Sequence, residues 1–197
     1  MSLVETNIYL FVMATVLAVL EIQIEGEHGW AKNLPTWRPK NPTWYSKTYQ
    51  RVMSGKEMTG YHLSMFGFVL LILCLPFVFG LPLTLGNALR IAIFYFLFSA
   101  MWDFLWFVLN PYYPLKKFKA EYLSFHHKSW LLGVPTDYWG ALILTLILSV
   151  LGQFVLHMPN LVAWWGTNVA LFLFQVFLMI LFSLYVLKID NWHPSKK

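Results

Sequence analysis

Residues 85–109 read LGNALRIAIFYFLFSAMWDFLWFVL, an apolar run that contains one arginine and one aspartate. A helix of this length exceeds the roughly 20 residues that are needed to cross a hydrocarbon core about 30 Å thick. Asn110 and Pro111 follow the run, and the residue before a proline disfavours helix. The run therefore predicts a membrane span in which Asp103 lies about seven residues, or roughly 10 Å, before the end.

Four further apolar runs of similar length occur, at about residues 3–24, 61–79, 138–156 and 163–187. The chain is 58% hydrophobic and 12% charged, whereas a soluble domain carries about 25% charged residues. No polar linker separates two apolar blocks, so we expect a single transmembrane domain over residues 1–197. The predicted fold class is an all-α integral membrane protein, a bundle of five transmembrane helices with a cytoplasmic interfacial cap.

Basic residues are distributed asymmetrically about these spans. Five spans place segments 25–60, 110–137 and 188–197 on the side opposite the amino terminus. All of the 14 Lys and Arg residues except Arg90 lie in these three segments. By the positive-inside rule that side is cytoplasmic and the amino terminus is outside. We therefore expect a plasma (inner) membrane protein that contacts lipids, with anionic headgroups on its cytoplasmic face, and does not bind nucleic acid.

The end of the first span carries three ionisable residues, Glu21, Glu25 and His28, spaced i, i+4 and i+7. On a helix they share one face. Glu25 and His28 also form a Glu-x-x-His pair, the spacing with which four-helix carboxylate proteins hold metals. Gly26 weakens the helix after Glu25, so the two glutamates are the firmer pair. An alternative is that Glu25 and His28 lie among headgroups, but Glu21 sits inside the span, where a carboxylate indicates a functional site.

Asp103 is a second carboxylate inside a span, and its depth below the cytoplasmic side is similar to that of Glu21. A buried aspartate needs a partner, because an unpaired charge in an apolar environment is costly. One interpretation is a hydrogen bond to a neighbouring helix. The other is that Glu21 and Asp103 belong to one site assembled from two spans.

Further candidates lie in the segment between the third and fourth spans and at its end. His126 and His127 are adjacent, and neutral imidazole suits zinc, iron or copper. If this segment is helical, at most one of them points inward; the alternative is a basic loop that faces headgroups. Asp137 opens the fourth span, where an aspartate is also a routine helix cap. His62, at the start of the second span, is a weaker candidate.

Carboxylates and imidazoles from three or four elements are the ligands that a metal site with one or two ions needs. The expected cofactor is a divalent metal ion, namely zinc, iron or manganese. The expected ligands come from one set: Glu21, Glu25, His28, Asp103, His126, His127 and Asp137.

The leading hypothesis is a small membrane enzyme, metal-dependent or acid–base in mechanism, that acts on a lipid or isoprenoid substrate with Glu21 and Asp103 as catalytic residues. The alternatives are a non-enzymatic scaffold or partner subunit and a component of a proton- or cation-coupled transporter. Transport is less favoured because the ionisable groups stay at one side rather than recurring at several depths. The chain has no His-Glu-x-x-His, Gly-x-Ser-x-Gly or P-loop motif.

Overall fold

The computed structural model describes residues 2–26, 28–113, 115–123 and 129–192. Five of its helices are long and apolar enough to cross a membrane, which confirms the prediction of five such helices. Their bounds differ from the expected spans by at most two residues. They are α1 (Leu3–Glu25), α3 (Gly60–Val78), α4 (Leu85–Val108), α6 (Thr136–Phe154) and α7 (Leu161–Leu181), which continues as the π-helical segment η2 (Phe182–Leu187).

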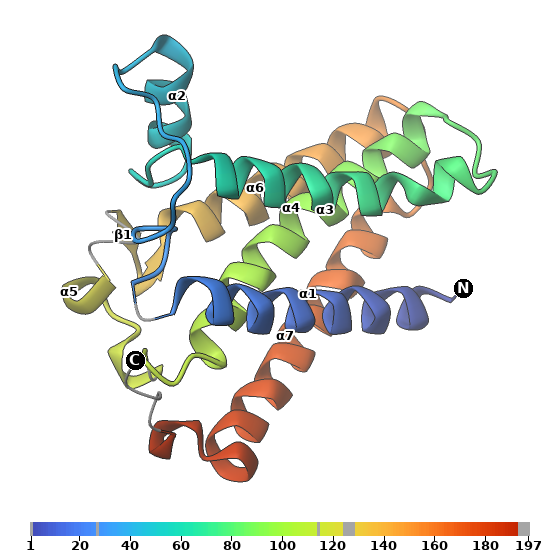
Figure 1. Cartoon of the computed structure of the whole chain (residues 1–197). Coiled ribbons are helices and arrows are strands. Elements are labelled where there is room, and N and C mark those ends of the chain that lie inside the picture. The colour runs from blue at the N-terminus through green and yellow to red at the C-terminus, as the bar shows by residue number, and fades with distance from the viewer. Residues whose placement is uncertain (1, 27, 114, 124–128, 193–197) are drawn as a thin grey trace.

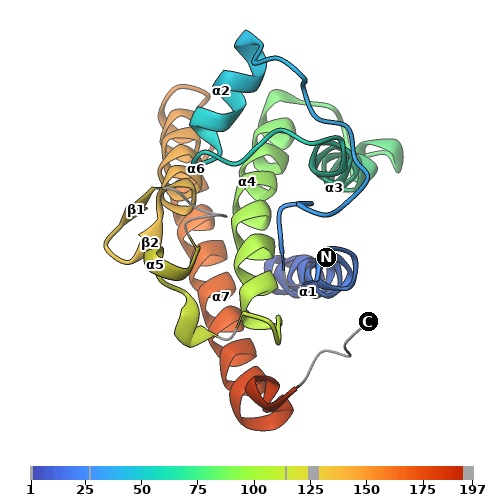
Figure 2. The ribbon, with the colours of Figure 1, turned by 60° about the vertical axis from the view of Figure 1, so that its left-hand side comes forward.

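Helix α4 forms the centre of the bundle (Figures 1 and 2). The other four long helices all pack against it. Half of its most apolar stretch (50%) is buried within the protein, compared with 28% or less in each of the others. The aromatic side chains of α4 therefore contact protein more than they contact the surroundings.

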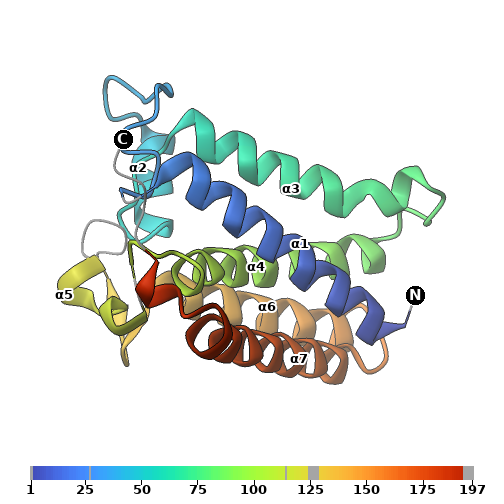
Figure 3. The ribbon, with the colours of Figure 1, turned by 60° about the horizontal axis from the view of Figure 1, so that its bottom comes forward.

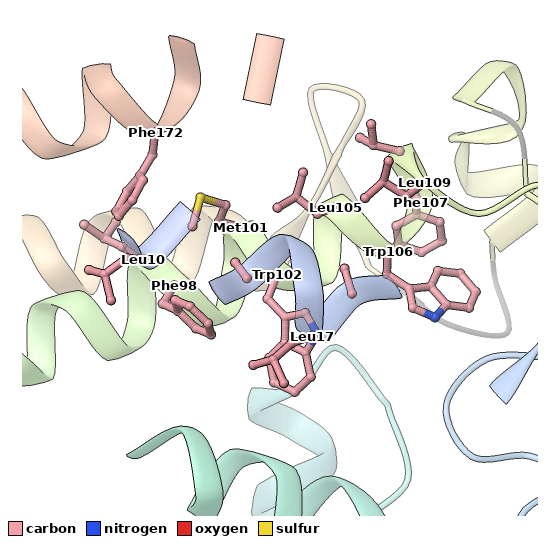
Figure 4. Close-up of a cluster of buried hydrophobic side chains, with 14 of the residues drawn as sticks. Leu10, Leu17, Phe98, Met101, Trp102, Leu105, Trp106, Phe107, Leu109 and Phe172 are labelled. Carbon is pink, nitrogen blue, oxygen red and sulfur yellow. The ribbon is translucent and has the colours of Figure 1, made fainter. Parts of the chain in front are cut away.

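The core lies on both sides of α4 (Figure 4). Phe98, Trp102 and Trp106 of α4 are almost fully buried and belong to one cluster that also contains Leu17 of α1 and Phe172 of α7. Burial of each large aromatic side chain contributes roughly 1.5–3 kcal/mol when the alternative is water. In hydrocarbon that term would be small, and close packing of these rings would then be the main source of stability.

The outer faces of the surrounding helices carry exposed apolar side chains. Val16 on α1 and Leu71 on α3 are 60% and 70% exposed, and Leu173 on α7 is similarly open. Contiguous apolar surface of this kind is unusual on a soluble monomer. It is the surface expected of a bundle that hydrocarbon surrounds.

The connecting segments divide between the two ends of the bundle (Figure 3). The amino-terminal residues and the α3–α4 and α6–α7 turns lie at one end. The opposite end, called the α2 end below, carries the remaining short elements. They are α2 (Trp44–Val52), η1 (Leu115–Lys117), α5 (Ala120–Leu123), the antiparallel pair β1 (Trp130–Leu131) and β2 (Val134–Pro135), and η3 (Ile189–Asn191).

Two helix ends near the α2 end follow directly from the local sequence. Helix α1 stops at Glu25 because Gly26 adopts a left-handed φ of +63°. Helix α3 starts at Gly60 because the Thr59 hydroxyl accepts a hydrogen bond from the His62 backbone N–H at 3.2 Å. A Cβ atom at Gly60 would lie 2.2 Å from the Trp37 ring, so any larger residue there would have to displace the ring.

Candidate metal centre and the polar cluster beside it

Two glutamates from α1 and one histidine from α3 meet inside the protein at the α2 end. Glu21 and Glu25, one helical turn apart, lie on the inward face of α1, and His62 lies in the first turn of α3. Their side chains are 9%, 2% and 2% exposed. One ligand atom from each residue lies within 4.8 Å of the other two. This group of three, called the Glu–Glu–His group below, could hold a metal ion.

The two distances from His62 to the glutamates match those between ligands of one ion. His62 Nε2 lies 3.4 Å from Glu25 Oε1 and 3.6 Å from Glu21 Oε1. Two donor atoms that are each about 2.0–2.2 Å from one tetrahedral ion are separated by about 3.3–3.6 Å. A direct charge-assisted hydrogen bond would be shorter, at about 2.7–2.9 Å. The spacing therefore fits a shared ion better than a direct imidazole–carboxylate pair.

The orientation of His62 is set by its neighbours. Its Nδ1 lies 2.8 Å from the Thr59 hydroxyl, and the Trp30 ring stacks on the imidazole with a centroid distance of 3.7 Å and an interplanar angle of 12°. These contacts direct Nε2 toward the glutamates. Metal-bound histidines usually use the second ring nitrogen in this way, as a hydrogen-bond donor to a nearby oxygen. The Ala31 backbone N–H donates to Glu25 Oε1 and holds that carboxylate.

A second cluster, called the lysine–aspartate cluster below, contains Lys56, Asp103, Asp137 and Tyr138. The buried Lys56 Nζ lies 3.2 Å from Asp103 Oδ1 and 3.2 Å from Asp137 Oδ2. The Tyr138 hydroxyl donates to Asp103 Oδ2 at 2.5 Å. One lysine thus bridges carboxylates from α4 and α6, and the phenol adds a proton donor to the same network.

Trp30 lies between the two groups and contacts both. Its ring stacks on His62, and Lys56 Nζ lies 4.7 Å from the ring centroid in a cation–π contact. The indole Nε1 donates to the Glu57 carbonyl at 2.6 Å. Trp30 and Ala31 both have positive φ, of 47° and 53°, a backbone that costs non-glycine residues roughly 1–3 kcal/mol and that clusters at functional sites. The surrounding contacts maintain this turn.

A cavity of about 530 Å³ adjoins the lysine–aspartate cluster between α2, α3, α4 and α6. Lys56, Asp103 and Asp137 line its polar part, while Phe66 and Leu144 are among its apolar lining residues. A second cavity of about 310 Å³ lies between α4, α6 and α7 and is lined almost entirely by apolar side chains. Only the first cavity brings charged groups and apolar surface together.

The structure places the predicted residues in different groups. It brings Glu21 and Glu25 together, as their helical spacing predicts, but Asp103 and Asp137 belong to the lysine–aspartate cluster. Asp137 forms no side-chain cap for α6 and pairs with Lys56 instead. His28 follows the end of α1, is half-buried and is not one of the three grouped residues. The predicted ligands His126 and His127 lie outside the described residues.

Two central residues, His62 and Lys56, carry little signal in the sequence. His62 was only a weaker candidate, although its position three residues after the helix-capping Thr59 places it at the same end as Glu25. Lys56 is one of the basic residues of segment 25–60, whose charge predicts contact with anionic headgroups, yet it is among the most buried charged residues that the structure describes. Nothing in its local sequence distinguishes it from the exposed Lys47.

Comparisons of the chain with protein-family models, with curated proteins and with solved structures found no match.

Proposed function

We propose that Glu21, Glu25 and His62 bind a divalent transition-metal ion and that the protein is a membrane-embedded enzyme that acts on a lipid or isoprenoid substrate at its cytoplasmic end. The observation that carries the proposal is the spacing of three buried donor atoms, 3.4 Å and 3.6 Å from His62 Nε2 to the two carboxylates. Three protein ligands leave a coordination position for water or substrate, as in catalytic zinc sites.

The chemistry of the ligands supports a transition metal of the zinc, iron or manganese kind. Imidazole suits zinc and iron, and carboxylate suits manganese. Two ionised carboxylates in a buried site cost several kcal/mol each unless a cation compensates them. A divalent ion supplies that compensation, which one imidazolium alone does not. When bound, such an ion would polarise a substrate oxygen or lower the pKa of a bound water.

The lysine–aspartate cluster supplies groups for proton transfer beside the proposed metal. The Tyr138 hydroxyl already donates to Asp103, so a proton donor and an acceptor stand in hydrogen-bond contact at the wall of the larger cavity. General acid–base catalysis needs such a pair within reach of the substrate. The basic segments at the α2 end support a cytoplasmic location for this chemistry.

Metal analysis of the purified protein in detergent tests the metal. We expect about one zinc, iron or manganese ion per chain in the wild type and its loss in E21Q and H62N. The matched controls are E57Q and H157N, because Glu57 and His157 are exposed and outside the group. Equal metal content in all five proteins, or none in the wild type at unchanged thermal stability after chelation, would exclude the site.

Turnover is tested on native membranes. Mass spectrometry of the total lipid extract, before and after incubation with the wild-type protein, is expected to show a lipid species consumed and another formed. E21Q, D103N and wild type treated with chelator are expected to leave the extract unchanged, whereas E57Q behaves as the wild type.

A second candidate function is a structural metal clamp in a non-enzymatic scaffold. The observation that favours it is burial of the site. The three side chains are almost fully buried, and an ion bound to them would join α1 to α3. A clamp predicts that chelation lowers the unfolding temperature while the lipid extract never changes. The enzyme predicts metal-dependent change in the extract, so the two functions are distinguishable.

A further inference from the structure

The larger cavity has a polar end and an apolar end, and they are arranged along the axis of the bundle. Its lining runs on α4 from Asp103 back to Phe96 and on α6 from Asp137 on to Leu144. On each helix the lining residues extend over about seven residues, or roughly 10 Å, away from the α2 end. Apolar lining on α3 includes Phe66, which also lies below the polar end. A lipid in a bilayer has the same order, with its headgroup at the surface and its chain parallel to the helices.

Helix α2 closes the polar end and supplies two groups without partners. Tyr49, Arg51 and Val52 of α2 line the cavity together with residues of α3, α4 and α6. Figure 2 shows α3 and α6 on opposite sides of α4. The Tyr49 hydroxyl is buried at the cavity and has no hydrogen-bond partner among the described residues. Arg51, in the last turn of α2, also lines the cavity and forms no ion pair within the described part of the chain. Buried polar groups usually have partners, so the Tyr49 hydroxyl indicates a missing acceptor. Arg51 is exposed and offers a cation at the same wall of the cavity.

The neighbouring charges determine where an anion would sit. Lys56 is already placed between Asp103 and Asp137, so its charge is compensated within the protein. Arg51 is the cation of the cavity that no carboxylate of the described residues neutralises. Burial raises the pKa of Tyr49 above its usual range, and the nearby Tyr95 raises it further. Tyr49 therefore stays a neutral phenol and a hydrogen-bond donor at physiological pH.

We propose that this cavity binds a lipid with an anionic phosphate headgroup, which Arg51 and Tyr49 hold at the α2 end while one acyl chain lies between α3, α4 and α6. Arginine forks onto phosphate oxygens with paired hydrogen bonds. The volume of about 530 Å³ is within the range of about 300–1,000 Å³ that ligand sites occupy. The site uses none of Glu21, Glu25 and His62, so it is independent of the proposed metal.

Photocrosslinking in nanodiscs of phosphatidylcholine tests the site. The probe is a phosphatidic acid that carries a diazirine in one acyl chain, and the crosslinked residues are mapped by mass spectrometry. We expect crosslinks at lining residues of α3, α4 and α6. R51Q is expected to weaken binding about tenfold or more, because a hydrogen bond to a charged group is lost. K47Q, which removes an exposed cation from the same helix, is expected to bind as the wild type.

A bulky side chain in the apolar end of the cavity tests the proposal independently of Arg51. Ser99 lines the cavity and Ser64 is exposed on α3, so S99F is expected to lower the crosslink yield and S64F is not. E21Q is expected to crosslink as the wild type, which separates this proposal from the metal proposal. Crosslinks spread over the outer faces of the bundle, equal yields for R51Q and K47Q, or equal affinity for a phosphatidylcholine probe would each overturn the proposal.

Discussion

At the scale of single residues, the α2 end is organised around Lys56. Its ammonium contacts two carboxylates and one indole ring, and its side chain is almost fully buried. Such a network stabilises the fold only while each of its charges is paired. Removing one member of a buried charged network leaves the others uncompensated, which costs about 3–5 kcal/mol.

Substitution of Lys56 is therefore expected to destabilise the protein. K56M removes the charge but keeps much of the side-chain volume, and it leaves Asp103 and Asp137 without their shared cation. We expect the free energy of unfolding to fall by about 3 kcal/mol. This is the lower end of the range for buried pairs, because both aspartates are partly exposed and solvent weakens their interaction with Lys56. Thermal unfolding in detergent, followed by circular dichroism, measures the change.

The control for this variant is K47M, at an exposed position on α2, for which a change within about 0.5 kcal/mol is expected. The triple variant K56M/D103N/D137N is expected to recover part of the loss, because no uncompensated charge remains. A K56M protein as stable as K47M would show that the buried ion pairs contribute nothing.

At the scale of elements, the starts and ends of helices position the candidate metal ligands. Glu25 is the last residue of α1 and His62 is in the first turn of α3. The intervening chain returns from one to the other through the left-handed turn at Trp30 and Ala31. The close approach of Trp37 to Gly60 joins the same chain to the start of α3. The end of α1 and the start of α3 therefore determine the geometry of the site, because a shift of either helix end would move the metal ligand that it carries.

Gly60 tests this dependence. A methyl group there would overlap the Trp37 ring, so G60A is expected to lower the free energy of unfolding by about 1–3 kcal/mol and to weaken metal retention through His62. The control is G67A on the same helix, where nothing lies within 4 Å of the added carbon; it is expected to be neutral or up to about 1 kcal/mol more stable.

Removal of the ring provides the complementary test. Trp37 is 59% exposed, so W37A alone is expected to cost little. In a double-mutant cycle, G60A/W37A is expected to recover most of the G60A loss, with a coupling energy of about 0.5–3 kcal/mol. Additive effects of the two substitutions would show that the ring and the glycine are not in conflict.

At the scale of the whole molecule, the buried ionisable groups of the described residues all lie at the α2 end, namely Glu21, Glu25, Lys56 and His62. The opposite half offers neutral amides: Asn7 of α1 donates to Asn168 of α7 at 2.9 Å. Interhelical amide contacts of this kind stabilise membrane bundles. A relay for protons across the bundle would need ionisable groups at more than one depth, so this distribution favours a one-sided site over transport.

Orientation in the membrane is a further prediction at this scale. In a C74S background, L83C places a thiol in the α3–α4 turn and K47C places one on α2 at the opposite end. The positive-inside rule predicts that a membrane-impermeant maleimide labels L83C in intact cells and labels K47C only after permeabilisation. The reverse result would place the amino terminus in the cytoplasm and contradict the proposed location of the site.

Hydrophobic runs and helical spacing were enough to predict five long helices, the clustering of charge toward one end and the pairing of Glu21 with Glu25. These features depend on one helix at a time, because length and periodicity within a run determine which residues share a face. The tertiary structure decided which partners those glutamates meet. It selected His62 over His28, and it placed Asp103 with Lys56 in a second cluster, with Trp30 between that cluster and the glutamates. Helix packing and a left-handed turn produce these contacts, and neither leaves a periodic pattern in the sequence.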